Sequence, residues 1–411
     1  MIELCDSAIE HLDETIRHSR RTDGLYHSYN LIRFSGDGSG ASVEPLYEML
    51  EGQVAVLSSD VLSGQERADV IDALFASQMY RADQRSFMLY PARHLPSFLD
   101  KNVMPAESVR GNPLLAALLE AGDCSVIAVD VDGRFRFSAA FTNRDHLEAT
   151  LDRLAGETKW SSLVAAHREA ALDTYKQVFR HHAYTGRSGS MYGYEGIGSI
   201  YWHMVAKLLV AVQESVLDAV SEGAQQATVE RLIDAYWRVR SGLGFNKTAA
   251  QFGAISIDPY SHTPAHAGAQ QPGMTGLVKE ELLTRPLELG VRVNNGEIWY
   301  DPVLLRRTEL LGDPERWPVY DLNLEQSVIQ LNESSLGMTL CQVAVVVSVS
   351  SGDAHVEVFF ADGTTEHHPG LHVDRENSAK VFARSGEITQ IHAYVPDHAV
   401  QGVMLSTTES N

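Results

Sequence analysis

Apolar residues recur every three or four positions along most of the first three quarters of the chain, which is the period of an amphipathic helix. Between residues 2 and 20, Leu4, Ala8, Leu12 and Ile16 lie four apart and form one apolar stripe on an acidic helix. Residues 196–220 are apolar almost all round, so the pattern predicts a buried helix there. Further helices are predicted over residues 43–58, 64–80, 112–121, 143–155, 160–182, 226–241 and 276–289.

The last quarter of the chain changes to the two-residue period and the turn residues that are typical of strands. Asn295-Gly296, flanked by alternating residues, predicts a tight hairpin. An earlier hairpin is predicted near residues 124–141, around Asp132-Gly133. The sequence therefore predicts a mainly α protein. Its helical domain would cover residues 1–310 with the inserted hairpin, and a β-sandwich or sheet layer would cover residues 311–411.

The balance of charge removes several classes of function. The 411 residues include 54 Asp and Glu against 33 Lys and Arg, a net charge of −21. This excess disfavours binding to nucleic acid or to an anionic membrane, because both need clustered cationic side chains. The three cysteines, Cys5, Cys124 and Cys341, form no CxxC pair and cannot build a disulfide framework. Without a signal peptide or a stretch of ~18 apolar residues, the sequence predicts a cytoplasmic protein.

The richest candidate for chemistry is residues 187–203, where glycines and serines alternate with tyrosines directly ahead of the buried helix. Glycine lets the backbone approach a ligand closely, and a helix start offers N–H groups and a positive dipole end. Glu195 is the only carboxylate of the segment, and packing among aromatic rings would raise its pKa, as a general acid needs. Trp202 lies inside the predicted helix, where a ring equally suits the core. The side chains predicted to contact substrate here are Tyr192, Tyr194, Trp202 and His203.

A second polar segment, residues 258–271, is held by two prolines and so suits a pre-organised site. Asp258 is the second candidate carboxylate, with a turn-capping role as its structural alternative. His262 and His266 lie four apart, but Pro264 between them disfavours a helical zinc-binding pair, so no metal is predicted. Nucleotide-binding and serine-hydrolase motifs do not occur, so no cofactor is predicted. The predicted substrate ligands of this segment are His262, His266, Gln270 and Gln271.

Two shorter polar loops are weaker candidates. Residues 26–30 form an aromatic polar loop after the first helix, and residues 83–85 precede a stretch without helical period. A structural role explains each of them at least as well as a contact with substrate.

Three segments with aromatic and polar residues at predicted helix starts read DGLYHSYN (23–30), MYGYEGIGSIYWHM (191–204) and DPYSHTPAHAGAQQPGMTG (258–276). Together with the helical region and the C-terminal strands, they resemble the (α/α)6-toroid carbohydrate-active enzymes. The nearest comparison is with glycoside phosphorylases of the cellobiose phosphorylase type and with glycoside hydrolases that share the toroid. The resemblance implies an oligosaccharide or glycoside substrate, with phosphate as a co-substrate in the phosphorylases. The pattern predicts about nine helices where a full toroid has twelve, which implies the C-terminal part of a longer enzyme and a further polypeptide that completes the toroid.

The hypothesis from the sequence is a carbohydrate-active enzyme that cleaves or phosphorolyses a glycosidic bond. Such cleavage needs two carboxyl groups, or one carboxyl group and an attacking phosphate. Glu195 is assigned as the acid and Asp258 as the base. The rival hypothesis is a non-catalytic sugar-binding or structural part of a larger carbohydrate-enzyme assembly. A lyase on a related toroid is a further alternative, which would require a positively charged cleft.

Overall fold

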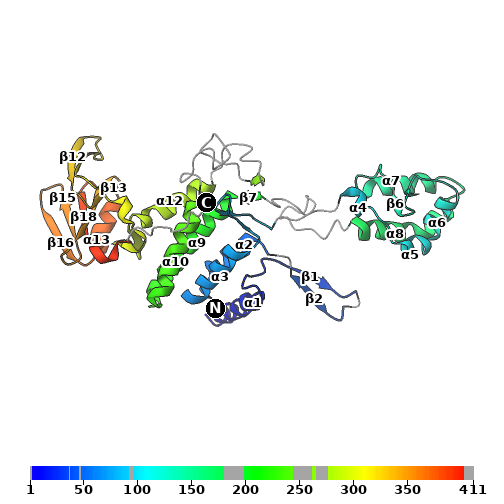
Figure 1. Ribbon diagram of the computed structural model, residues 1–411, viewed down its shortest axis with the longest axis horizontal. Coiled ribbons are helices and arrows are strands. Elements are labelled where there is room, and N and C mark those ends of the chain that lie inside the picture. The colour runs from blue at the N-terminus through cyan, green and yellow to red at the C-terminus, as the bar shows by residue number, and fades with distance from the viewer. Residues whose placement is uncertain are drawn as a thin grey trace, which may run out of the picture. The chain divides into compact units, whose positions relative to one another are not determined.

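The computed structural model describes residues 2–36, 38–45, 48–91, 97–179, 199–243, 262–264 and 276–401. The chain divides into two compact units, whose helices and strands are labelled in Figure 1. Unit 1 comprises residues 1–26, 50–87 and 200–411, and unit 2 comprises residues 27–49 and 88–199. The larger part of unit 2 is therefore inserted, in sequence, between two parts of unit 1.

The mainly α toroid expected from the sequence is wrong. The described residues are 44% helical and 25% strand, and their helices belong to two separate units rather than to one ring. Short sheets also occur where no strand was expected, as in β3 (Tyr80–Arg81) and β4 (Ser86–Phe87). A hydrophobic period reports which face a helix buries but not which neighbour it packs on, so it cannot decide the architecture.

Unit 1 is organised around α9 (Trp202–Ser221), which packs against α2, α3, α10 and α12 (Figure 1). The buried helix predicted from this sequence is confirmed, because Val205, Leu208 and Val212 have no exposed surface. A Cβ atom added at Gly64 would lie 2.9 Å from the Cβ of Ala219, so glycine permits a close helix contact there. Among the helices that the structure describes, none combines the length and apolar character needed to cross a bilayer. The described helices of unit 1 are α1 (Ile2–His18), α2 (Leu50–Leu57), α3 (Gly64–Ala76), α9, α10 (Gln226–Ser241), α12 (Gly276–Glu288) and α13 (Arg375–Phe382).

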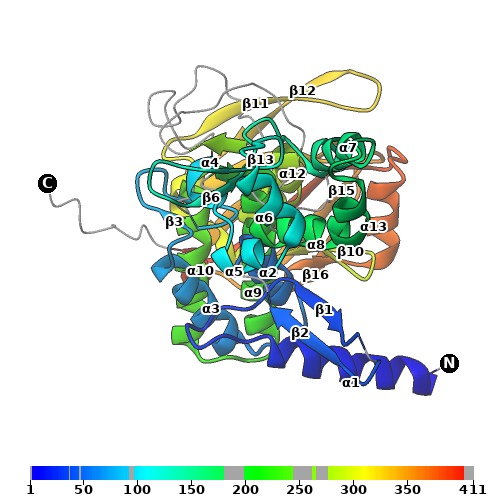
Figure 2. The same cartoon turned by 90° about the vertical axis from the view of Figure 1, so that its right-hand side faces the viewer.

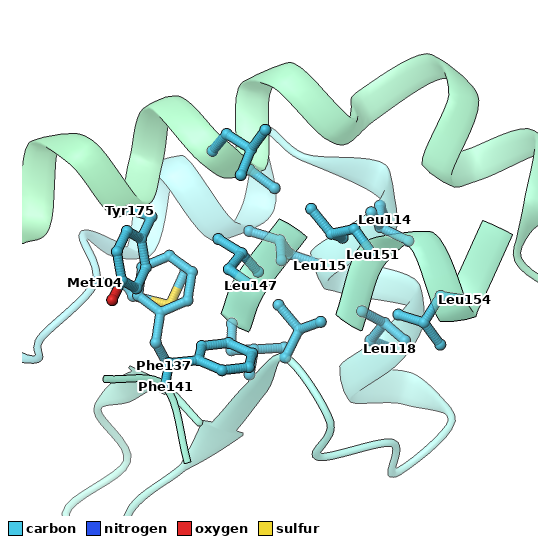
Figure 3. Close-up of a cluster of buried hydrophobic side chains, with 14 of the residues drawn as sticks. Met104, Leu114, Leu115, Leu118, Phe137, Phe141, Leu147, Leu151, Leu154 and Tyr175 are labelled. Atoms are coloured by element: carbon cyan, nitrogen blue, oxygen red, sulfur yellow. The ribbon is translucent and has the colours of Figure 1, made fainter. Parts of the chain in front are cut away.

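Unit 2 has its own hydrophobic core, shown in Figure 3. Leu114 and Leu118 from α6 meet Leu147 and Leu151 from α7, and Phe137 of β6 closes one side of this core. All five side chains are at most 2% exposed, so the core is as closed as that of an independent domain. The elements of unit 2 are β1 (Asn30–Phe34), β2 (Ala41–Pro45), α4 (Phe98–Lys101), α5 (Ala106–Arg110), α6 (Pro113–Glu120), β5 (Ile127–Val129), β6 (Phe135–Phe137), α7 (Arg144–Ala155) and α8 (Ser161–Phe179).

Unit 2 contains one hairpin that the sequence predicted and one that it did not. β5 and β6 pair around Gly133, which has a φ of +77°, and this confirms the hairpin predicted near residues 124–141. The helix predicted over residues 43–58 is partly wrong, because residues 41–45 pair with β1 and the helix α2 begins at Leu50. Residues 43–45 lie at the edge of a helical period, and cross-strand pairing overrides that weak local preference.

The C-terminal part of unit 1 contains most of its strands. β9 (Val291–Asn294) and β10 (Glu297–Tyr300) form the predicted hairpin, with Asn295 and Gly296 at φ values of 50° and 80°. β17 (His372–Val373) extends this hairpin to three strands, and β11 (Glu315–Tyr320) pairs with β12 (Gln326–Leu331). A mixed five-stranded sheet has the order β13-β14-β18-β15-β16. Its strands are β13 (Ser335–Leu340), β14 (Val343–Ser350), β18 (Ile388–Pro396), β15 (His355–Phe360) and β16 (Thr365–Pro369).

The two faces of this five-stranded sheet differ in chemistry. One face contributes Val345, Val358 and Ile391 to an apolar core, and all three are fully buried. The other face carries half-buried polar rings, among them Tyr394, whose ring stacks at 4.3 Å on His355 and at 4.1 Å on His392. The Tyr394 hydroxyl donates to the Glu357 carboxylate at 3.1 Å. This alternation follows from the two-residue period of strands.

Tyr394 should make unfolding pH-dependent in the alkaline range. Burial, followed by the adjacent Glu357 carboxylate, raises the pKa of Tyr394 from 10.0 to about 12. Between about pH 10 and about pH 12 the unfolded chain loses this proton while the folded chain keeps it, so the stabilisation falls as pH rises. Between these two pH values, the free energy of unfolding measured with urea should fall less for a Tyr394→Phe variant than for the parent. Tyr320→Phe, at a tyrosine that is 52% exposed, is the matched control and should not alter the slope.

Candidate functional site

The structure joins the two segments in which the sequence places the site. β7 (Ser199–Tyr201) lies at the end of the glycine- and tyrosine-rich segment, and β8 (His262–Pro264) lies within the histidine- and glutamine-rich segment. Backbone hydrogen bonds pair these two strands in one small sheet. Segments about 60 residues apart in sequence are therefore neighbours at this point.

The chain passes directly from β7 into α9. Tyr201 occupies the N-cap position with extended backbone, and its side chain makes no capping hydrogen bond to the helix. Trp202 begins the helix and is 1% exposed, so its ring is part of the core of unit 1. His203 is half-buried, and its ring centroid lies 5.8 Å from that of Tyr201. The roles predicted for Trp202 and His203 in contacting substrate stay predictions.

For the other predicted site residues, the structure describes no side chain. The backbone of His262 lies in β8. The remaining ones, which are Tyr192, Tyr194, Glu195, Asp258, His266, Gln270 and Gln271, lie outside the described residues.

A buried polar network connects α9, α10 and α12, the helices next to the two segments in sequence. Glu288 of α12 is fully buried, and its Oε1 accepts hydrogen bonds from the Tyr236 hydroxyl at 2.6 Å and the Arg240 Nε at 2.7 Å. Its Oε2 accepts a bond from Arg285 at 2.9 Å. Arg240 is 1% exposed, so this is a buried ion pair with additional hydrogen bonds. The network holds the C-terminal turn of α12 on α10.

The network continues to α9 and to the C-terminal part of unit 1. The Gln213 side-chain amide of α9 donates to the carbonyl of Thr284 at 3.0 Å. Arg285 donates to both carboxylate oxygens of Glu309, at 2.6 and 3.1 Å. Burial, together with the nearby Glu288, raises the pKa of Tyr236, so this tyrosine stays protonated as a donor. Hydrogen bonds from Arg285 to the Glu309 and Glu288 carboxylates raise the pKa of Arg285.

This network positions the candidate site without being part of it. α9 starts immediately after the first segment, whereas α10 ends at Ser241 and α12 begins at Gly276, on either side of the second segment. Fixing the three helices therefore fixes the end of the first segment at α9, and it fixes the two helices that precede and follow the second segment in sequence. The sequence analysis missed these residues. The sequence did contain a signal for this network. Arg240 and Glu288 are charged residues on otherwise apolar helical faces, and charged side chains that are buried are usually paired.

One of the weaker candidate loops lies against the chain where it leaves α10. Arg85 has a φ of +50°, and its carbonyl lies against Gly242, the residue that follows α10. Asp83 of the same loop forms an ion pair with Arg81 at 2.7 Å. A Cβ atom at residue 242 would overlap the Arg85 carbonyl oxygen and come within 3.3 Å of the Val239 carbonyl oxygen. Glycine is thus required where the chain leaves α10.

A Gly242→Ala substitution should destabilise unit 1 by about 1–3 kcal/mol, the usual range for overpacking a closed contact. The clash involves backbone atoms on both sides, so no side-chain rotation can relieve it. Equilibrium urea unfolding measures the effect. Gly312→Ala is the control, because a Cβ there meets no atom within 4 Å. Equal stability of the two variants would show that the loop at Arg85 moves away freely.

A further cluster could in principle hold a metal ion. Among the described residues, Glu366, His368 and Asp374 offer ligand atoms that lie within 4.8 Å of one another. The amide of Asn377, which is 4% exposed, donates to the Glu366 carboxylate at 2.8 Å and to the Asp374 carboxylate at 3.1 Å. The Asn377 amide therefore holds the Glu366 and Asp374 carboxylates together through hydrogen bonds.

A comparison with known protein families finds a match for part of the chain. Residues 95–182 match the family of the GH149 phosphorylase insertion domain 2. The matched range lies within unit 2 and contains α4 to α8, the part of the chain that is inserted in sequence within unit 1. No curated protein matches the chain. The match is to an insertion domain of phosphorylases, and the matched range ends before both candidate segments, residues 187–203 and 258–271.

Proposed function

We propose that this chain acts in the phosphorolysis of a glycosidic bond, with the site at the junction of β7 and β8. The observation that carries the proposal is the pairing of β7 with β8, which brings two polar segments together. The similarity of residues 95–182 to a phosphorylase insertion domain supports phosphate, rather than water, as the attacking group. An uncharged saccharide needs no cationic surface, so the saccharide part of the proposal agrees with the acidic charge of the chain.

The proposed chemistry assigns a role to each predicted residue. A phosphate oxygen attacks the anomeric carbon, the bond from that carbon to the glycosidic oxygen breaks, and Glu195 donates a proton to the leaving oxygen. The products are a sugar phosphate and the shortened saccharide. In the hydrolytic alternative, Asp258 removes a proton from an attacking water. The first turn of α9, with its positive dipole end, favours a bound phosphate near Trp202.

The remaining predicted residues would bind rather than react. Tyr192, Tyr194 and Trp202 are assigned to contacts with sugar rings, whose apolar faces stack on aromatic side chains. Histidine and glutamine side chains donate and accept hydrogen bonds, so they suit hydroxyl groups and phosphate oxygens. The residues given this role are His203, His262, His266, Gln270 and Gln271.

The test is an assay of the purified chain with inorganic phosphate and a panel of oligosaccharides. Formation of a sugar phosphate that requires both components supports phosphorolysis, whereas release of reducing sugar without phosphate supports hydrolysis. The same panel is titrated by calorimetry. Binding without either product would overturn the catalytic proposal and support the rival, a non-catalytic sugar-binding part of a larger assembly that includes a further polypeptide.

A further inference from the structure

Two polar side chains of the edge strand β16 lie on the same face of the five-stranded sheet as its apolar core. Glu366 and His368 pair in register with two fully buried valines of β15. Because side chains alternate along a strand, these two residues share the core face, and His367 between them lies on the opposite face. Helix α13 contributes to the same core and lies beside the strands of this sheet (Figure 1 and Figure 2).

A carboxylate at the start of α13 faces these two side chains. Asp374 is the N-cap residue of the helix, and its Oδ1 accepts a hydrogen bond from the backbone N–H of Asn377 at 2.9 Å. Its Oδ2 lies 3.5 Å from the Nδ1 of His368. The Nε2 of His368 lies 3.5 Å from the Oε2 of Glu366. One ligand atom from each of these three residues lies within 4.8 Å of the others, so β16 and α13 bring two carboxylates and one imidazole together.

Hydrogen bonds do not account for the imidazole of this cluster. The His368 side chain is 15% exposed, and its Nε2 atom is buried. Within the part of the chain that the structure describes, this nitrogen has no hydrogen-bond partner. Buried polar atoms in proteins nearly always have a partner, so an unsatisfied one indicates a group that binds there.

The negative charge of the cluster is not offset by a basic side chain. Among the described residues, neither Glu366 nor Asp374 forms an ion pair with lysine or arginine. Lys380, which interacts with Glu366 only at longer range, pairs instead with Glu376 at 3.1 Å. Two carboxylates that share a site repel one another unless a cation lies between them. A divalent cation would remove this repulsion and would satisfy the imidazole nitrogen.

The donor atoms and their spacing favour zinc. Imidazole suits zinc and other late transition metals, whereas calcium and magnesium take oxygen ligands. In a tetrahedral zinc site with bonds of about 2.1 Å, two ligand atoms lie about 3.4 Å apart. In an octahedral magnesium site, neighbouring ligands lie about 3.0 Å apart. The separation of 3.5 Å between His368 and Glu366 fits zinc, and rotation of the exposed Glu366 side chain can close the remaining distances.

A buried amide holds the two carboxylates in position. Asn377 is 4% exposed, and its side chain donates to Glu366 at 2.8 Å and to Asp374 at 3.1 Å. Outer hydrogen bonds of this kind orient ligating carboxylates in metal sites. Each carboxylate retains further lone pairs that can coordinate an ion. The ligands are therefore pre-oriented by a side chain that solvent hardly reaches.

We propose that Glu366, His368 and Asp374 form a zinc site that joins the edge strand β16 to helix α13. Water completes the four-coordinate shell. The ion stabilises the contact between the two elements, and no step of a reaction is assigned to it. The proposal does not depend on the proposed enzymatic function, because the site contains none of the residues assigned to the reaction.

The first experiment titrates zinc chloride into the full chain by calorimetry, after a chelator has been added and then removed. Every chain carries Cys5→Ser and Cys124→Ser, because exposed thiols also bind zinc. We expect one equivalent of zinc to bind with a dissociation constant of about 10 µM or below. His368→Gln and Glu366→Gln should each weaken this binding at least about tenfold, because each removes a ligand.

His367→Gln is the matched control for this titration. It makes the same change one position away, on the opposite face of β16, at a side chain that is 65% exposed. It should keep the affinity of the parent. The proposal is overturned if the parent binds no zinc, if His368→Gln binds it as tightly as the parent, or if His367→Gln loses it.

The second experiment asks whether zinc stabilises the folded chain, as a ligand that binds the native state must. Zinc at about 100 µM should raise the midpoint of urea unfolding for the parent and for His367→Gln, but not for His368→Gln. Magnesium at the same concentration should leave all three midpoints unchanged. Circular dichroism without metal checks that each variant is folded. An equal rise in all three chains would place the ion elsewhere, and an unchanged parent would exclude a zinc link between β16 and α13.

Discussion

A Glu288→Ala variant is expected to lose about 3–5 kcal/mol of the free energy of unfolding, the usual cost of removing one partner of a buried ion pair. The carboxylate is fully buried and accepts hydrogen bonds from Tyr236, Arg240 and Arg285. Its removal leaves the Arg240 guanidinium, which is 1% exposed, as a buried cation without this counterion. The loss should exceed that from any single surface contact of unit 1.

Equilibrium urea unfolding measures this loss, and two variants separate its causes. Glu288→Gln keeps the shape of the side chain but removes its charge and turns one accepting oxygen into a donor, so it separates the loss of packing from the loss of charge and hydrogen bonding. Glu230→Ala, at an exposed position of α10, should change the unfolding free energy by no more than about 0.5 kcal/mol. If Glu288→Ala were as stable as Glu230→Ala, the network would not hold α12 on α10, and its role in positioning the two segments would be lost.

The largest expected effect on activity comes from Glu195. A Glu195→Gln variant should turn over at least about a hundredfold more slowly, since general acid catalysis contributes that factor or more. Glutamine has nearly the same shape but cannot donate a proton to the leaving oxygen. The loss should be smaller for substrates whose leaving group is already a weak base, because such a group needs less protonation.

The measurement compares initial rates of sugar phosphate formation for an oligosaccharide and for an activated aryl glycoside. Glu230→Gln, on the exposed face of α10, is the control and should keep the parent rate. Calorimetry with the oligosaccharide shows whether the Glu195→Gln variant still binds substrate. Undiminished turnover of both substrates would remove Glu195 from the mechanism. Asp258 would then be the next candidate for the acid, and Asp258→Asn would test it.

Sequence patterns gave the correct local structure where a few neighbouring residues decide it. Asn295-Gly296 and Asp132-Gly133 both lie in hairpin turns, because these residue pairs tolerate the positive φ that such turns require. α3 begins after Ser63. The Ser63 side chain accepts a hydrogen bond from the Glu66 backbone, and the Glu66 side chain accepts one from the Ser63 backbone, which is a capping box. α9 is buried as its uniformly apolar sequence predicts.

The same patterns failed where a distant partner decides the outcome. Residues 43–45 fall in the predicted helix, yet they form part of β2 because β1 is available for pairing. The sequence analysis assigned the helices to a toroid through a family resemblance, whereas the tertiary structure divides the described helices between two units. The length of a helix is a local property, but its neighbours are chosen by burial over the whole unit.

For the candidate site, the sequence alone determined which two segments are rich in carboxylate, aromatic and histidine side chains. Tertiary structure decided that these segments meet, through the pairing of β7 with β8. It also decided that Glu288 and Arg240, 48 positions apart, form a buried ion pair between α12 and α10. Local signals extend over a few residues because they depend on backbone dihedral angles and nearby hydrogen bonds. Contacts between distant residues form only when the closing of long loops is offset by the burial of many side chains together.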